Sequence, residues 1–221
     1  MNAHLGFNPR SQANSNALAD FVLADVRESC NAVATDLSSE KLKPIKNADV
    51  RTRVTSRNVD LIFAEQGLAA GAVRAAVENK TIMAAHGKAR WNRYGDLIAY
   101  CNHMHNHRAD CIAGAIVIVN CCPTYENPDA FAKGLVRPRF DMQKVVKDTI
   151  KIFAGIPLRS SADEPNDQPE ALAVIVVNYD GKNPAKLMDD ELAPQPNSPI
   201  CYEKFLGTLC NLYRQRFGRR R

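Results

Sequence analysis

Apolar residues recur every three or four positions in four stretches of the chain, which is the spacing of one face of an α-helix. In the first stretch Leu18, Val22 and Val26 fall on one side, and Asn14 or Ser15 is suited to cap the start of the helix. Each stretch is expected to turn its apolar side toward a shared core. The four predicted helices span residues 14–36, 88–106, 142–154 and 202–217.

Five other stretches have the patterns of β-strands. Two of them are continuous runs of apolar, largely β-branched side chains, which is typical of strands covered on both faces. The other three follow one another and carry alternating or β-rich sequences. Residues 38–48 contain Pro44 and three lysines and are expected to be a connection. The predicted strands span residues 50–54, 58–65, 72–83, 111–119 and 171–177.

The order of these elements is helix, three strands, helix, strand, helix, strand and helix, which predicts an α/β fold. The chain has 221 residues, of which 45% are hydrophobic and 24% are charged, an ordinary composition for a folded protein with a sizeable core. No internal repeat or linker interrupts it. Residues 1–221 are therefore predicted to form a single domain.

Missing signals exclude several classes of protein. No apolar run reaches the roughly 18–20 residues of a membrane span, and the first residues lack both a basic and an apolar signal region, so no membrane and a cytoplasmic location are expected. Neither a P-loop nor a dinucleotide fingerprint is present, so no nucleotide cofactor is expected. The seven cysteines are odd in number and irregularly spaced, and reduced thiols are expected.

A cluster of charge interrupts two otherwise apolar strands. Asp60 lies in the first, NVDLIF, and Glu78 and Lys80 lie in the second, VRAAVENKTI. Because side chains alternate along a strand, Glu78 and Lys80 point to the same face. Carboxylates on neighbouring strands suit Mg²⁺, and a nearby ammonium group can steady an attacking water. The alternative is a structural ion pair between Lys80 and one of the carboxylates.

This arrangement resembles the PD-(D/E)XK nuclease superfamily, to which many type II restriction endonucleases belong. The resemblance rests on Asp60, seventeen intervening residues and then Glu78-Asn79-Lys80, together with the order of helix and strands over residues 14–120. Val59 stands where the family usually has a proline. The resemblance implies a restriction-endonuclease-like fold, with a central mixed β-sheet flanked by helices.

The same resemblance implies roles for particular residues. Asp60 and Glu78 would hold Mg²⁺, and Lys80 would position the nucleophilic water. Glu28, on the first predicted helix, is a candidate additional metal ligand. The implied activity is that of a type II restriction endonuclease, a Mg²⁺-dependent hydrolase of phosphodiester bonds in double-stranded DNA at a specific site. A homodimer would present two sites to the two strands of a duplex.

Two other functions remain open at this point. One is a defence or repair nuclease of the same fold that cuts DNA without sequence preference. The other is a DNA-binding module without catalysis, in which the basic residues matter and the acidic residues only form ion pairs. Discrete fragments of plasmid DNA would favour the restriction enzyme, and a smear would favour the nonspecific nuclease.

Basic residues cluster along the chain, although the net charge of +5, from 29 Lys and Arg against 24 Asp and Glu, is modest. Asp96 and Tyr100, on the same predicted helix as several of them, could brace Lys80 or an arginine. The loops 121–140 and 180–199 are candidates for contact with a DNA groove. The residues predicted to contact DNA are His86, Lys88, Arg90, Asn92, Arg93, Arg51, Arg53 and Arg57.

Three histidines near the end of the same helix admit a metal interpretation. His103 and His107 are four residues apart and share a helix face, which makes a possible half-site for zinc. The spacing of the surrounding cysteines and of His105 fits no zinc finger. A polar helix end is therefore the favoured interpretation.

Overall fold

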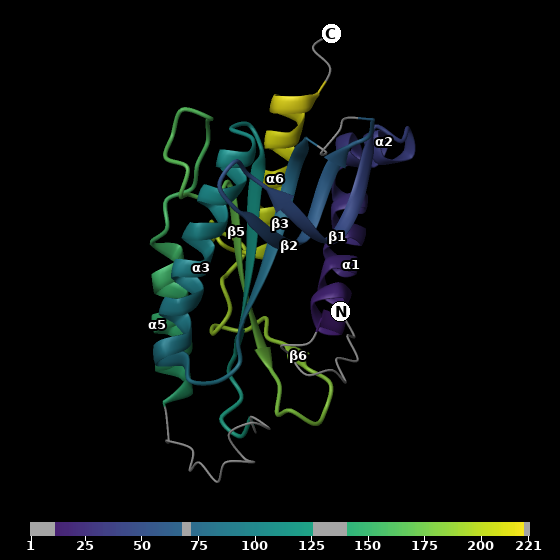
Figure 1. Ribbon diagram of the computed structural model, residues 1–221. Helices are drawn as coiled ribbons and strands as arrows, with labels where there is room; N and C mark the ends of the chain where they lie inside the picture. Colours follow the sequence, from purple (N-terminus) through teal and green to yellow (C-terminus); the bar gives the residue numbers. More distant parts are fainter. Residues whose placement is uncertain (1–11, 68–71, 126–140, 219–221) are drawn as a thin grey trace.

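The computed structural model describes residues 12–67, 72–125 and 141–218, which form one six-stranded sheet (Figure 1). The strands, in spatial as well as sequence order, are β1 (Leu42–Arg51), β2 (Ser56–Glu65), β3 (Val73–Ile82), β4 (Ile112–Asn120), β5 (Ala171–Asn178) and β6 (Lys186–Leu187). β1, β2 and β3 are antiparallel to one another, β3, β4 and β5 are parallel, and β6 is antiparallel to β5. The predicted α/β class with a mixed sheet is confirmed.

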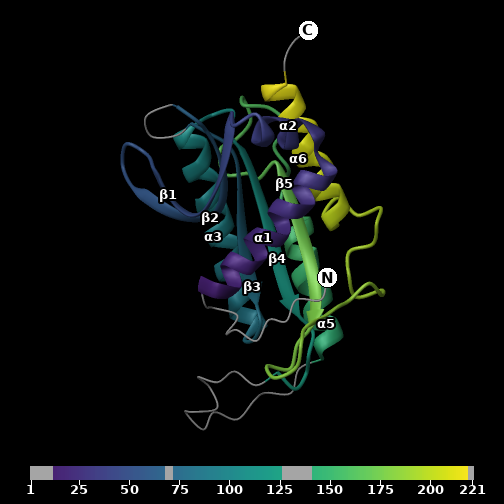
Figure 2. The same ribbon diagram turned by 90° about the vertical axis from the view of Figure 1, so that its right-hand side faces the viewer.

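Helices cover both faces of the sheet. α3 and α5 pack on one face, and α1, α2 and α6 pack on the other, where α1 crosses in front of the strands in Figure 2. The helices are α1 (Gln12–Ser29), α2 (Asn31–Ser38), α3 (His86–His107), α5 (Met142–Ala154) and α6 (Tyr202–Phe217). In the three described ranges, no helix combines the length and the apolar character that crossing a membrane requires.

Two predicted boundaries are wrong. The single helix predicted over residues 14–36 is broken at Cys30, whose backbone leaves the helical region at φ −126° and ψ 89°. β1 begins at Leu42, inside the predicted connection, and residues 52–55 form the turn rather than the end of a strand. β1 lies at the edge of the sheet, where Pro44 and exposed lysines are tolerated because one side of the strand needs no partner.

A disulfide joins the N-terminal helices to α6, contrary to the expectation that the thiols are reduced. Cys30, at the break between α1 and α2, is bonded to Cys210 in α6, 180 residues away in the sequence. Neither the spacing of the cysteines nor the predicted cytoplasmic location leads one to expect this bond. The other five cysteines are free and buried, and burial raises the pKa of the Cys101, Cys111 and Cys121 thiols.

Loss of this disulfide is expected to destabilise the fold. Because the bond closes a loop of 180 residues, the Cys210→Ser variant should lower the free energy of unfolding by about 2–4 kcal/mol through the greater entropy of its unfolded chain. Urea unfolding of both proteins under oxidising conditions measures the difference. With a reducing agent present the difference should shrink, whereas Cys201→Ser, at a free thiol, should not reproduce this dependence on reductant.

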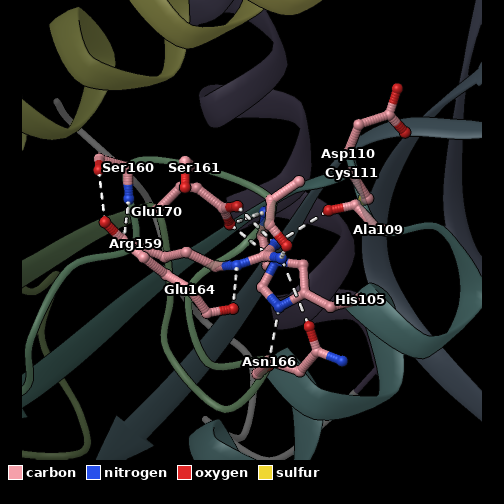
Figure 3. A network of polar contacts seen from close by, with 12 residues as sticks. His105, Ala109, Asp110, Cys111, Arg159, Ser160, Ser161, Glu164, Asn166 and Glu170 are labelled. Carbon is pink, nitrogen blue, oxygen red and sulfur yellow. Dashed lines mark hydrogen bonds and ion pairs between the residues drawn. The ribbon is translucent and has the colours of Figure 1, made fainter.

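A buried network of charged side chains fastens the loop that precedes β5 (Figure 3). The Glu170 side chain is fully buried and accepts from Arg159 Nη1 at 3.2 Å, from Arg216 Nη1 at 2.9 Å and from the main-chain N–H of Ala113 at 2.8 Å. His105 Nε2 lies 2.9 Å from the same carboxylate. Residues from α3, β4, α6 and the loop therefore meet at one carboxylate, which fixes the loop against the sheet.

Candidate active site

Asp60 and Glu78 lie where β2 and β3 separate. The two strands pair from Leu61 opposite Val77 to Ala64 opposite Val73, and the residues just beyond the Leu61 pair are Asp60 and Glu78. Glu78 Oε2 lies 3.4 Å from the main-chain nitrogen of Asp60, and Asp60 Oδ2 accepts from the main-chain N–H of Asn79 at 2.7 Å. Each carboxylate therefore faces a main-chain N–H group of the neighbouring strand at the point where the two strands no longer pair with each other.

Glu78 is a buried carboxylate between two cations. Its residue is only 4% exposed, and its Oε1 lies 2.5 Å from Lys80 Nζ and 3.4 Å from Arg57 Nη2. Burial raises the pKa of Glu78 above its ordinary value, the charge of Lys80 opposes the rise, and the negative charge of Asp60 adds to it. Further positive charge at this position would stabilise the ionised form.

Asp60 connects the sheet to the first turns of α1. Its Oδ1 accepts a hydrogen bond from Ser15, and its residue is half-buried. Glu28, the predicted additional metal ligand, lies thirteen residues further along the same helix, about 20 Å away at 1.5 Å per residue, and is exposed. The structure therefore brings Ser15, and not Glu28, to Asp60.

Arg57 is turned into the protein, although the sequence groups it with Arg51 and Arg53. Besides its contact with Glu78, its Nη2 donates to the main-chain oxygen of Asp96 at 3.3 Å, and its guanidinium carbon lies 5.8 Å from the centre of the Tyr100 ring. These contacts agree with the prediction that α3 braces an arginine. Arg57 belongs to the charged cluster of the site, whereas Arg51 and Arg53 are exposed.

The other predicted DNA contacts lie on α3 and are dispersed. Arg93 adjoins the site, because its Nε donates to the main-chain oxygen of Thr81, next to Lys80, while its Nη1 pairs with Asp96 at 2.7 Å. Arg90 lies 3.9 Å from the Asp148 carboxylate of α5. His86 is buried, with its Nε2 2.7 Å from the main-chain oxygen of Asn120, and Lys88 and Asn92 are exposed.

The histidines at the end of α3 contact protein oxygen atoms. His103 Nε2 lies 2.9 Å from the Val50 main-chain oxygen, His107 Nδ1 lies 2.8 Å from that of Arg51, and His105 joins the network of Glu170. Within residues 12–67, 72–125 and 141–218, no group of three or more His, Cys, Asp or Glu side chains is arranged to hold a metal ion. Tertiary packing against β1, which sequence spacing does not reveal, accounts for His103 and His107.

Asn79 carries unused hydrogen-bonding capacity beside Asp60. Its side-chain oxygen and nitrogen are both buried and make no hydrogen bond in the structure. Buried amides are nearly always hydrogen-bonded, so this position favours an additional water or ligand group. Asn79 is adjacent to Glu78 in β3, so its side chain points to the opposite face of the sheet and is not part of one donor set with Glu78. The carboxylate oxygens of Asp60 and Glu78 are the hard donors that Mg²⁺ prefers, and these two residues fit that ion.

Ser15 is part of the site, although the sequence pattern indicates only a helix cap there, and it lies inside α1 rather than at its start. Its proximity to Asp60 depends on where α1 packs, and no local pattern carries that information. Most of the first loop predicted to contact a DNA groove, residues 126–140 of 121–140, lies outside the described residues. The loop 180–199 contains the short strand β6 and extends from the carboxyl end of β5.

Comparison with known proteins identifies no relative of this chain. No family model matches the chain, and no match was found among the curated proteins or the solved structures. The geometry and the chemistry of the residues themselves must therefore carry any functional conclusion.

Proposed function

We propose that the chain is a Mg²⁺-dependent endonuclease of the PD-(D/E)XK type, with the restriction-endonuclease-like fold, that hydrolyses phosphodiester bonds of double-stranded DNA at a specific site. The observation that carries the proposal is the meeting of Asp60 and Glu78 where β2 and β3 separate, with Lys80 in contact with Glu78. The order α1, α2, β1, β2, β3, α3 and β4 supports it, since it repeats the order on which the resemblance rests once α1 and α2 are taken as the single predicted helix.

The chemical roles follow from the contacts. Asp60 and Glu78 would hold Mg²⁺, which, when bound, supplies a Lewis acid that polarises the phosphate and stabilises the negative charge of the transition state. Lys80 holds an ammonium group beside the buried carboxylate and can orient a water for attack on phosphorus. Arg93, at the margin of the site, can attract a phosphate beside the scissile bond, while Arg57 offsets the charge of Glu78.

The charge balance of the site favours a polyanionic substrate with a divalent cation. Lys80 and Arg57 already offset the charges of Glu78 and Asp60, so the isolated site is close to neutral. A phosphate group adds negative charge, and a divalent cation compensates it. This balance also provides the competing explanation, in which the four side chains only pair with one another and the protein binds DNA without cleaving it.

Plasmid cleavage distinguishes these functions. Purified protein with Mg²⁺ should produce discrete fragments, and EDTA or the Glu78→Gln variant should abolish them, whereas Glu203→Gln, at an exposed position on α6, should cleave as the wild type does. Cleavage that yields a smear moves the function to a nonspecific nuclease. DNA binding without cleavage in either Mg²⁺ or Mn²⁺ overturns the catalytic assignment in favour of a binding module.

The same experiment addresses assembly. We propose a homodimer, because one site cuts one strand and a two-fold pair of sites matches the two strands of a duplex. Linear products formed without an accumulating nicked circle would support paired sites acting together. Accumulation of nicked circles throughout the reaction would contradict this assembly and leave the active site itself in place.

A further inference from the structure

The hairpin of β1 and β2 extends beyond the rest of the sheet. Its strands pair as far as Arg51 opposite Ser56, whereas β2 pairs with β3 only from Leu61 onward. Residues 48–59, here named the arm, are therefore paired only within the hairpin. The arm curls away from the sheet and forms the left-hand margin of the molecule in Figure 2.

The arm is held in a fixed direction by α3. The His103 and His107 rings lie 2.9 Å and 2.8 Å from the main-chain oxygens of Val50 and Arg51, on one strand of the arm. From the other strand, Arg57 reaches the main-chain oxygen of Asp96 on the same helix. Contacts at both strands brace the arm, so its end is presented by a supported hairpin.

The turn at the end of the arm, residues 52–55, is closed by its own hydrogen bonds. The Thr52 main-chain N–H donates to the Thr55 oxygen at 2.8 Å, and the Thr52 hydroxyl accepts from the N–H groups of Val54 and Thr55 at 3.3 Å and 3.1 Å. These bonds define the backbone of the turn without using the side chains of Arg53 and Val54. Both side chains are therefore available to a partner.

The end of the arm combines positive charge with an exposed apolar group. Val54 is 94% exposed, the highest exposure of any large hydrophobic residue in the described ranges, so its side chain adds nothing to the core. Arg53 next to it is exposed, and the Arg51 side chain is 82% exposed. Cations beside an apolar apex match a partner with phosphates outside and with base edges inside that carry both hydrogen-bond acceptors and the methyl groups of thymine.

We propose that the arm enters the major groove of duplex DNA, where Arg53 and Val54 read base edges; this inference rests on the proposed function. Two strands about 5 Å apart with their side chains fit a groove about 12 Å wide and not the minor groove of about 6 Å. An arginine matches the acceptors of guanine, and an apolar side chain matches the methyl group of thymine. Arg57, at the base of the arm, contacts Glu78, and Arg53 lies four residues away from it, about 13 Å along a strand. Because DNA rises about 3.4 Å per base pair, the base contacts of the arm would lie about four base pairs from the cut.

The test separates base reading from phosphate binding. Wild type, Arg53→Ala and Val54→Ser are each allowed to bind a pool of randomised duplexes in EDTA, where cleavage is excluded, and the retained sequences are determined. Arg53→Ala is expected to lower the preference for one G·C pair about 10-fold, and Val54→Ser to weaken a preference for a neighbouring T·A pair. Lys204→Ala, an exposed charge on α6 on the opposite face of the sheet, serves as the matched control and should leave both preferences unchanged.

Each outcome has a distinct meaning. An equal weakening of binding to all sequences by Arg53→Ala would show a phosphate contact only and would overturn groove reading by the arm. If both arm variants cut plasmid DNA at the same sites as the wild type, base reading by the arm would be overturned and the nuclease proposal would stand. Failure of the wild type to bind any duplex would overturn both. Equal melting temperatures of wild type and variants would show that altered preferences do not come from unfolding.

Discussion

Replacing Lys80 by alanine is expected to lower the rate of DNA cleavage by about 100- to 1,000-fold, the loss typical when one preorganised group that acts in the transition state is removed. Lys80 Nζ is the closest cation to Glu78, at 2.5 Å, and no other described ammonium or guanidinium group contacts the carboxylate except that of Arg57 at 3.4 Å. Single-turnover cleavage at saturating protein measures the effect. DNA affinity in EDTA should change by much less than the rate.

Two controls accompany Lys80→Ala: one keeps a positive charge at position 80, and the other removes a positive charge far from the site. Lys80→Arg keeps the positive charge but changes the shape of the group, and it should recover little activity if an ammonium group must hold a water. Lys204→Ala removes one exposed charge from α6 and should cleave normally. A Lys80→Ala protein that cleaves within about 3-fold of the wild-type rate would exclude the proposed role.

Replacing Glu170 by glutamine is expected to destabilise the fold by about 3–5 kcal/mol, because it leaves buried cations without their anion. The Arg159 side chain is fully buried, and the Arg216 side chain is 11% exposed. Chemical denaturation at pH 7 measures the loss. Asp163→Asn, in the same loop but exposed, should change the unfolding free energy by no more than about 0.5 kcal/mol.

The contribution of Glu170 should also depend on pH. Burial alone raises the pKa of this carboxyl, but hydrogen bonds and charge from His105, the Ala113 N–H and Arg216 outweigh burial and bring the pKa below its ordinary value. A depressed pKa in the folded state gives stability that is complete above the unfolded value of about 4.3 and is lost as the pH falls through the lower folded value. The difference between wild type and Glu170→Gln should therefore shrink in acid. A difference that stays constant down to pH 2 would contradict this assignment.

Local sequence patterns were sufficient for the class of fold and most elements. The apolar runs of β4 and β5 and the helical spacing in α3, α5 and α6 led to elements within a few residues of those observed. β1 was missed because Pro44 and its neighbouring lysines look like a loop, and they are tolerated only because the strand lies at an edge. The break at Cys30 is not visible because helical spacing continues through it.

The candidate site was predictable where it depends on strand periodicity and not where it depends on packing. Glu78 and Lys80 share a face because they are two residues apart in one strand. Arg57 is equivalent to Arg53 in sequence, and only the curvature of the hairpin over α3 turns one inward and leaves the other exposed. Likewise, which end of α1 lies beside Asp60 is decided by how the helix crosses the sheet.

The edge strand also limits how two copies of the chain can associate. β1 presents Lys43 and Lys46 and cannot donate a hydrogen bond at Pro44, while Asn47 interrupts its regular conformation with a φ of 51°. At the opposite edge β6 has only two residues, Lys186 and Leu187. Neither edge is suited to extend the sheet from one molecule into the next. A symmetric pair would therefore have to form through helices and loops, and each copy would keep its own separate sheet.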